Sequence, residues 1–325
     1  MHNIFVGSNS GAFLVSWVDR IADATMVHLG TEPVIAAATI PGRGVLCAVY
    51  NSNEDHGHSR LLWFNADTHT LTAASDTLVP RVTSIGIADG LIRVGTEGHH
   101  LYTLDEEVLT RDEEFDAVLR TEQLFESNYG AAISQITSDP TTGHGIIAVS
   151  TGGLWVHRHQ NWEVIDHPDF LRADEHNDRL ELRCVHGVSA GMHGDMLVQF
   201  HLGLKFHDGR HWFDVEKPGH MAGFSTIYRP FSNDYVAIPL VYDEQRSALN
   251  GDLSFWIVDA TTHATTNVPF GPHRDYSCVL RSGLTRSGTT IVAGTTSGRV
   301  VALDGVLVDE LPHHLGRILA VAAVD

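Results

Sequence analysis

The sequence predicts an all-β chain, a seven-bladed β-propeller of four-stranded antiparallel blades, and three observations carry this prediction. First, one phrase recurs at residues 6–14 (VGSNSGAFL), 94–102 (VGTEGHHLY), 149–155 (VSTGGLW) and 293–301 (AGTTSGRVV). Each copy is an apolar strand, a tight glycine-containing turn and a second apolar strand, which is the pattern of a β-hairpin. Second, the copies return at a period of roughly 40 to 55 residues, which for all-strand repeats is typical of a propeller. Third, the two ends of the chain supply complementary parts of one repeat.

Three weaker copies complete a set of seven hairpins. They join residues 46–50 to 61–64, 196–200 to 204–206, and 236–242 to 253–257. Most hairpins have a strand before and a strand after them, and four strands form a propeller blade. The expected preceding strands are 34–40, 82–88, 132–137, 182–188, 224–228 and 278–284. The expected following strands are 70–74, 107–110, 162–165, 212–215, 264–268 and 306–311.

The ends of the chain are expected to close the ring. The chain opens directly on a hairpin, whereas residues 317–324 form a last strand with no hairpin after it. Pairing the two completes a blade and removes an open sheet edge. We therefore expect a single domain over residues 1–325, with blades at roughly 317–325 plus 1–30, 33–79, 82–112, 131–166, 181–216, 222–270 and 277–312.

The repeat rhythm and the turn phrase 294–298 (GTTSG) resemble those of the WD40-like and PQQ-like superfamily of seven-bladed propellers, over the whole chain. The Gly-His and Trp-Asp pairs of WD40 repeats are missing, as is the Asp-box of sialidase-type propellers. The resemblance therefore implies an architecture and carries no catalytic residue. No GxSxG, Walker or Rossmann phrase stands in a suitable context, which favours a protein that is not an enzyme.

Composition excludes two classes of partner. The formal net charge is −19, and only Lys205 and Lys217 are lysines among 21 basic residues. A high-GC genome and a high-salt habitat both give lysine-poor, acidic chains, and both explanations stay open.

The negative field of the protein repels nucleic acid and anionic membranes, and no apolar run approaches the roughly 20 residues of a membrane helix. With no signal peptide visible, we expect a protein that is cytoplasmic or assembled into a particle from the cytoplasm.

The three cysteines are expected to be buried free thiols. Cys47, Cys184 and Cys278 fall in strand segments of different blades. An odd number without CxxC spacing argues against a disulfide framework or a zinc ribbon.

The long loops gather on one face of the predicted propeller. Each blade has its hairpin loop and its crossover to the next blade on the same face of the propeller, and we call this face the top face. Its long segments are 51–59, 110–130, 166–179 and 243–251, whereas the opposite loops are mostly brief. Because binding residues concentrate on loops of a rigid scaffold, we expect the functional surface there. Residues 111–128 are expected to include a short helix capped near Asp112, which would be a lid over the channel mouth, a docking element or a helix packed on the rim.

These top loops are acidic and rich in histidine. The candidate partner-binding residues are Glu54, Asp55, His56, His58, Asp174, His176, Asp243, Glu244, His273 and Asp275. Carboxylates and imidazoles also bind divalent metals, so Asp55, His56 and His58 are a candidate metal set. Solvated acidic loops are the alternative.

A second group of candidates falls on predicted innermost strands, which line the channel. Arg183, His186 and Arg281 are polar residues in apolar surroundings. They are suited to bind an anionic group or to form an acid/base pair. An internal salt-bridge or water network is the alternative.

Two functions remain open from the sequence. The first is a non-enzymatic platform that binds a protein or glycan partner on the top face, as a subunit of a larger cell-surface or viral assembly; it requires a contiguous, partly apolar patch. The second is a metal-dependent lyase or hydrolase at the channel mouth. That function requires Asp, Glu or His side chains from at least three blades to meet around a divalent ion.

Overall fold

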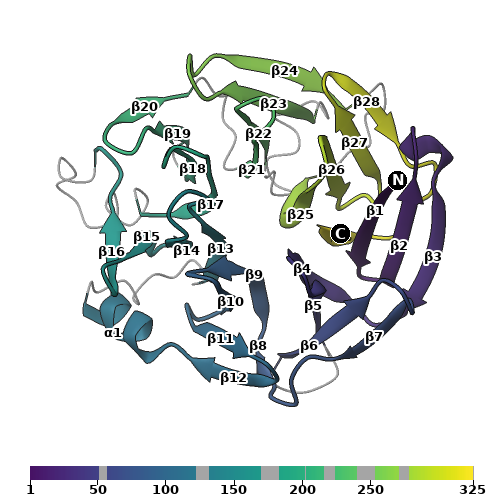
Figure 1. Ribbon diagram of the computed structural model, residues 1–325, viewed down its shortest axis with the longest axis horizontal. Coiled ribbons are helices and arrows are strands. Elements are labelled where there is room, and N and C mark those ends of the chain that lie inside the picture. Colours follow the sequence, from purple (N-terminus) through teal and green to yellow (C-terminus); the bar gives the residue numbers. More distant parts are fainter. Residues whose placement is uncertain are drawn as a thin grey trace.

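The computed structural model describes residues 1–50, 57–121, 132–169, 183–201, 203–215, 224–239, 253–270 and 278–324. It confirms the predicted all-β class, because the strands form seven antiparallel sheets arranged as blades around a central axis (Figure 1), where the innermost strands of several blades line a cavity that we call the channel. Within the residues described, no helix is long and apolar enough to cross a bilayer.

Each blade runs from an innermost strand at the channel to an outermost strand at the rim. Blade 1 contains β29 (Ile318–Ala323), β1 (His2–Ser8), β2 (Gly11–Trp17) and β3 (Thr25–Gly30). Blade 2 contains β4 (Val34–Ile40), β5 (Gly44–Tyr50), β6 (His58–Asn65) and β7 (Thr70–Ala73), and β8 (Val79–Pro80) pairs with β6. Blade 3 contains β9 (Val82–Ala88), β10 (Leu91–Thr96), β11 (Leu101–Asp105) and β12 (Val108–Arg111).

The remaining blades repeat this order. Blade 4 contains β13 (Ala132–Ser138), β14 (Gly145–Ser150), β15 (Gly153–Arg158) and β16 (Asn161–Ile165). Blade 5 contains β17 (Val185–Ala190), β18 (Met196–Phe200), β19 (Gly203–His207) and β20 (Trp212–Asp214). Blade 6 contains β21 (Phe224–Arg229), β22 (Asp234–Pro239), β23 (Ser254–Asp259) and β24 (Thr265–Pro269). Blade 7 contains β25 (Val279–Ser287), β26 (Thr290–Thr295), β27 (Val300–Asp304) and β28 (Leu307–Glu310).

Burial explains why these segments become strands in this order. The second strands β14 and β18 are buried at every residue, because each is covered by a neighbouring blade on both faces. Such strands are continuous apolar runs rather than alternating ones. The outermost strands β3 and β12 are mostly exposed. The core therefore lies between blades, in clusters that join the facing sides of adjacent sheets.

The two ends of the chain close the ring as predicted. β29 pairs with β1 in antiparallel register from Ile4 opposite Ala323 to Ser8 opposite Ile318. It forms the innermost strand of blade 1, and it contacts the innermost strands of both adjacent blades, β25 and β4. The ring therefore has no open sheet edge between its first and last repeats.

The expected helix in residues 111–128 is present as α1 (Glu113–Thr121). The Asp112 carboxylate accepts a hydrogen bond from the Phe115 amide at 2.9 Å, which is an N-cap. Phe115 and Leu119 are fully buried in the cluster that contains Trp155. Because α1 packs on the outer rim of the ring (Figure 1), it is not a lid over the channel mouth.

The close approach of blades 3 and 4 gives a first prediction. Gly86 lies in β9, and a methyl group there would overlap the backbone carbonyl oxygen of Ile136 in β13. Since backbone cannot give way cheaply, we expect Gly86→Ala to lower the free energy of unfolding by about 1–3 kcal/mol. Urea unfolding followed by circular dichroism measures this change.

A matched glycine serves as the control for Gly86. Gly30 ends β3, and a methyl group there would meet nothing nearer than Leu71 Cδ1 at 3.9 Å. Gly30→Ala is expected to leave stability unchanged or to raise it by up to about 1 kcal/mol. Equal effects of the two substitutions would contradict the tight packing of β9 on β13.

Candidate metal centre

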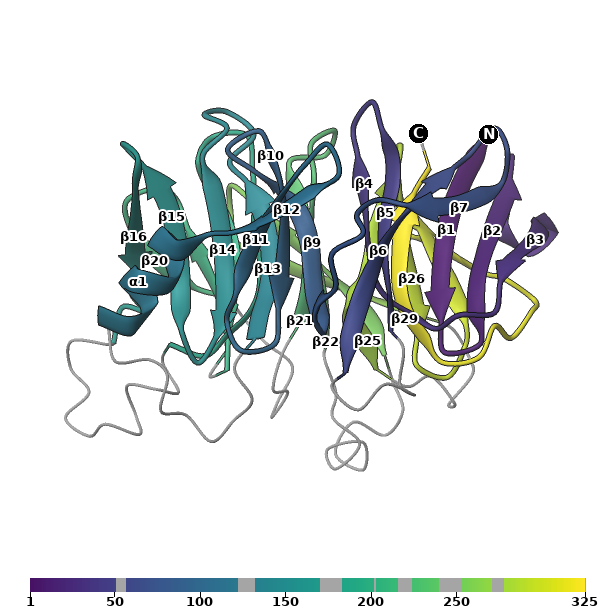
Figure 2. The ribbon, with the colours of Figure 1, turned by 90° about the horizontal axis from the view of Figure 1, so that it is seen from below.

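One irregularity recurs at the top-face end of the innermost strands. In six blades the register of this strand shifts against the second strand: five blades have one extra residue, a β-bulge, and blade 7 has a longer irregular stretch between Val279 and Leu284. A bulge sets two residues opposite one and redirects their side chains. The top face, on which these bulges lie, is at the lower edge of Figure 2, where the β1–β2 turn also lies.

The bulge defines three positions that we call the mouth triplet. The second is the bulged residue or, in blade 7, the first residue of the irregular stretch. The first lies two residues before it, and the third ends or follows the second strand of the blade. The third position pairs with the first, through a backbone hydrogen bond of 2.8–3.1 Å in five blades and through the strand register in blade 4. In blade order the triplets are Arg317/Leu319/Asn9, Pro33/Ile35/Tyr50, Arg81/Thr83/Glu97, Ala132/Ser134/Ser150, Cys184/His186/His201 and Cys278/Leu280/Thr296.

In several blades triplet side chains of quite different types contact one another. In blade 3 the Arg81 guanidinium forms an ion pair with Glu97 at 3.1 Å. In blade 4 the hydroxyls of the second and third positions, Ser134 and Ser150, lie 2.9 Å apart. Blade 5 has a metal-binding side chain at all three positions.

Two of the three ligand-atom separations in the blade 5 triplet match those of a tetrahedral metal site. Cys184 Sγ lies 3.4 Å from His186 Nε2, and His186 Nε2 lies 3.3 Å from His201 Nδ1. All three ligand atoms fall within 4.8 Å of one another. A tetrahedral zinc ion with ordinary bond lengths sets sulfur and nitrogen about 3.5 Å apart and two nitrogens about 3.4 Å apart. The side chains present therefore fit such an ion with little movement.

The electrostatics keep the central imidazole neutral. His186 is buried, and its pKa is lowered to about 3. Burial is the larger cause, and the positive charge of Arg281 is the next. Metals bind the neutral imidazole, so His186 is in its binding-competent charge state at neutral pH. Cys184 is half-buried and His201 reaches solvent, which leaves an entry path to the group.

Arg281 reaches this group from blade 7 across the channel mouth. It lies in the irregular stretch of β25 between Val279 and Leu284. Its Nη2 lies 3.1 Å from His186 Nδ1 and 3.3 Å from Ser150 Oγ in blade 4. Because a guanidinium only donates hydrogen bonds, His186 Nδ1 accepts here and the ring proton is on Nε2.

A cavity of about 240 Å³ adjoins Arg281 in the channel. Its walls come from the innermost strands of five blades. Of the described residues that line it, Arg281 is the charged one. The polar remainder of the wall is Thr39, Ser84, Ser134, Gln135, Ser282 and Thr285.

The structure brings together some of the residues singled out from the sequence. His186 and Arg281 meet, whereas the Arg183 guanidinium forms an ion pair with Asp166 at 2.9 Å. His58 lies in β6 opposite Pro80 and outside the triplets. The other top-loop candidates lie outside the described residues, so the Asp55, His56 and His58 metal set stays a prediction: these are Glu54, Asp55, His56, Asp174, His176, Asp243, Glu244, His273 and Asp275.

Sequence reasoning missed two members of the candidate metal centre, Cys184 and His201. The expectation of three buried thiols is correct for Cys47, whose pKa burial raises to about 12, and wrong for Cys184 and Cys278, which are half-buried. All three are described, and none is in a disulfide. The available signal was the closeness of a thiol and an imidazole in the sequence at 184–186, both of which are metal-ligand types.

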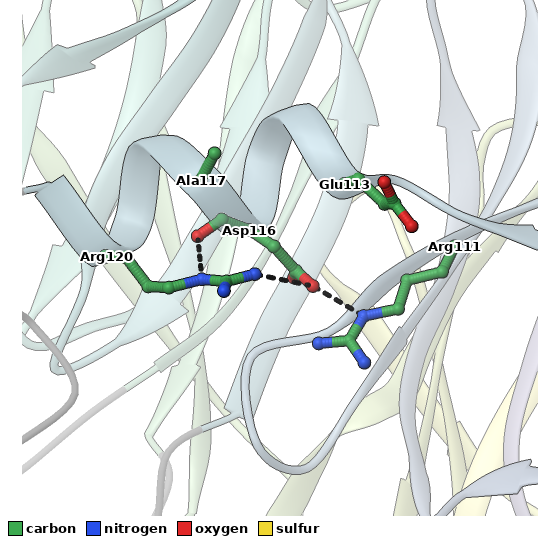
Figure 3. Close-up of a pocket in the computed structure, with 5 residues that line it drawn as sticks. All are labelled: Arg111, Glu113, Asp116, Ala117 and Arg120. Atoms are coloured by element: carbon green, nitrogen blue, oxygen red, sulfur yellow. Dashed lines mark hydrogen bonds and ion pairs between the residues drawn. The ribbon is translucent and has the colours of Figure 1, made fainter.

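A second cleft, of about 700 Å³, lies beside α1 (Figure 3). Its buried carboxylate, Asp116, forms ion pairs with Arg111 and Arg120. Glu113 and Ala117 complete the lining. The pairing of Asp116 with the two arginines fastens the helix to the rim, so we assign this cleft a structural role.

Comparison with known proteins supports the fold. No family model matches the chain, and no curated protein matches it. Two solved structures described as "putative 6-phosphogluconolactonase" align with a TM-score of 0.61 each. The protein from Bacteroides fragilis NCTC 9343 is 10% identical over 100% of this chain and 98% of its own, and that from Bacteroides uniformis ATCC 8492 is 12% identical over 99% of both chains. The hydrazine synthase of Kuenenia stuttgartiensis aligns over 89% of this chain and 78% of its own, with 12% identity and a TM-score of 0.53. At such identities the likeness shows the propeller fold alone.

Proposed function

We propose that the protein is a metal-dependent hydrolase whose active site is a zinc-class divalent ion held by Cys184, His186 and His201 at the channel mouth. The observation that carries this proposal is the meeting of one thiol and two imidazole nitrogens within 4.8 Å of one another, with both distances from His186 at tetrahedral values. Thiolate and imidazole are the ligand types that zinc prefers.

The number of ligands favours catalysis over a structural role. Structural zinc sites are closed by four protein ligands, whereas catalytic sites use three and keep one position open. Within the described part of the chain, no fourth histidine, cysteine or carboxylate joins the group. Zinc in such a site supplies Lewis acidity and lowers the pKa of a water ligand toward neutrality. The chain itself contributes the positive Arg281 beside the ligands and a neighbouring cavity.

This proposal differs from the sequence-based alternative in how the site is built. Ligands from at least three blades were expected, but blade 5 alone provides all three. The reason is the bulge, which aims an innermost-strand residue at the turn of its own blade. The non-enzymatic platform depends on top-loop residues that, except for His58, lie outside the described ranges, so it stays a separate prediction. Proteins named as enzymes are among the similar structures, which is compatible with catalysis on this fold.

The test is metal binding by the chelator-treated protein. We expect one zinc ion per chain by plasma mass spectrometry, and a thiolate-to-metal absorption band in the cobalt-loaded form. Cys184→Ser should remove the band and weaken zinc binding by at least about 100-fold in competition with a chromophoric chelator. Hydrolysis of 4-nitrophenyl acetate should depend on added zinc in the wild type and be lost in Cys184→Ser.

Blade 7 provides the matched control. Cys278 occupies the same triplet position as Cys184, but Leu280 and Thr296 replace the two histidines. Cys278→Ser should therefore keep the zinc stoichiometry, the band and the hydrolysis of the wild type. A wild type without stoichiometric zinc, or equal behaviour of the two serine variants, would refute the metal centre.

A further inference from the structure

We infer that Arg281 is the anion-binding residue of this site, and that it engages a small oxyanion when a metal ion binds His186. The inference rests on the proposed metal centre and adds the substrate class and its coupling to the metal. It stands on the contact between Arg281 and His186 and on the channel cavity beside them.

The cavity wall is suited to a negatively charged ligand. Arg281 lines it as a charged donor, and the Gln135 carboxamide lines it from β13. The Gln135 Oε1 atom accepts a hydrogen bond from the Val188 amide at 2.9 Å, which fixes the orientation of the amide group. Among the hydroxyls, Thr39 and Ser84 donate to backbone carbonyls at 2.7 and 2.9 Å. Guanidinium and amide NH groups are donors that pair with carboxylate, sulfate or phosphate oxygens.

The size of the cavity limits the ligand. Its volume of about 240 Å³ is below the roughly 300–1,000 Å³ of pockets for drug-sized molecules. A small carboxylate or a tetrahedral oxyanion fits this range, and a nucleotide or a peptide does not.

The contact between Arg281 and His186 couples the two sites. In the structure Arg281 Nη2 donates to His186 Nδ1, which leaves the ring proton on Nε2. Metal binding uses the Nε2 lone pair, so the neutral ring then carries its proton on Nδ1 and accepts no hydrogen bond there. Arg281 consequently loses this acceptor, and an oxyanion in the adjacent cavity replaces it. Metal and oxyanion therefore strengthen each other's binding, and by linkage the effect is reciprocal.

The experiment measures zinc affinity by competition with a chromophoric chelator, in chloride, in acetate and in sulfate at equal ionic strength. For the wild type we expect zinc to bind about tenfold more tightly in at least one oxyanion than in chloride. Acetate against sulfate distinguishes a carboxylate ligand from a tetrahedral one. Arg281→Gln should bind zinc in chloride with unchanged stoichiometry and lose the oxyanion effect. Arg286→Gln, on the same strand but away from the cavity lining, should behave as the wild type.

Each outcome separates the inference from the function on which it rests. Absence of zinc binding in chloride would overturn the metal centre and the inference together. Zinc binding that neither oxyanion changes would overturn the inference alone. An oxyanion effect that persists in Arg281→Gln would also overturn it, because the anion would then act on the metal directly.

Discussion

A chain that ends before β29 is expected to lose its cooperative fold. The lost strand contributes Ile318, Ala320 and Val321, all buried, and it is the only innermost strand of blade 1. Fully burying one Ile or Val side chain contributes about 1.5–3 kcal/mol, and the deletion also exposes the edge of β1 and the sides of β25 and β4. The total is comparable to the whole stability of a domain, about 5–15 kcal/mol. Truncation after His313 should abolish the thermal transition seen by circular dichroism and produce aggregates on gel filtration.

A circular permutant gives the control for this truncation. The last residues of β29 lie opposite the first of β1, so a short turn joins them, and new ends are placed between the exposed His313 and His314. This variant keeps β29 and should melt cooperatively. A truncated chain that melts like the permutant would show that blade 1 does not need its innermost strand.

Breaking the buried ion pair of blade 6 is expected to give the second large effect. Arg229 Nε and Nη2 each lie 2.6 Å from a carboxylate oxygen of Asp234, and both residues are buried. Removing one partner leaves a buried charge without compensation, which costs about 3–5 kcal/mol. Asp234→Ala should therefore lower the free energy of urea unfolding by that amount.

Two further variants test the cause of this loss. The exposed pair Arg81–Glu97 is solvated, so Glu97→Ala should change stability by less than about 1 kcal/mol. The double variant Arg229→Met with Asp234→Leu removes both charges and should recover most of the stability lost in Asp234→Ala. If the double variant is as unstable as the single one, the loss arises from packing rather than from an unpaired charge.

The fold was accessible from the sequence because its signals are local. The tight turns at Gly11 and Gly298 are preceded and followed by apolar strands, and both glycines have a positive φ. Repetition of that pattern gives the blade count, and the leftover strand at 317–324 gives the closure. The strands and turns follow from neighbouring residues, and the closure follows from a strand edge left unpaired at each end of the chain.

The candidate site was less accessible because it depends on a shift in strand register. Alternation along a strand predicts which face a side chain occupies, but one inserted residue reverses it. His186 is such a residue, so its partners were not readable from alternation. His201 follows the strand in a turn, and Arg281 comes from a blade two places further around the ring. The candidate site is therefore visible only in the structure, where His186, His201 and Arg281 come together.

The recurrence of the mouth triplet has a consequence for how activity is acquired on this scaffold. Six blades have the three backbone positions of the mouth triplet. The ion pair of blade 3 and the hydroxyl pair of blade 4 show that these positions accept side chains of unrelated chemistry. If blade 5 binds the proposed metal ion, exchanging three side chains is enough to install or erase a metal-binding site, with no change of strand, turn or blade number. Such a ring can gain new chemistry at one blade while the others preserve the fold, which makes it a permissive starting point for evolution and for design.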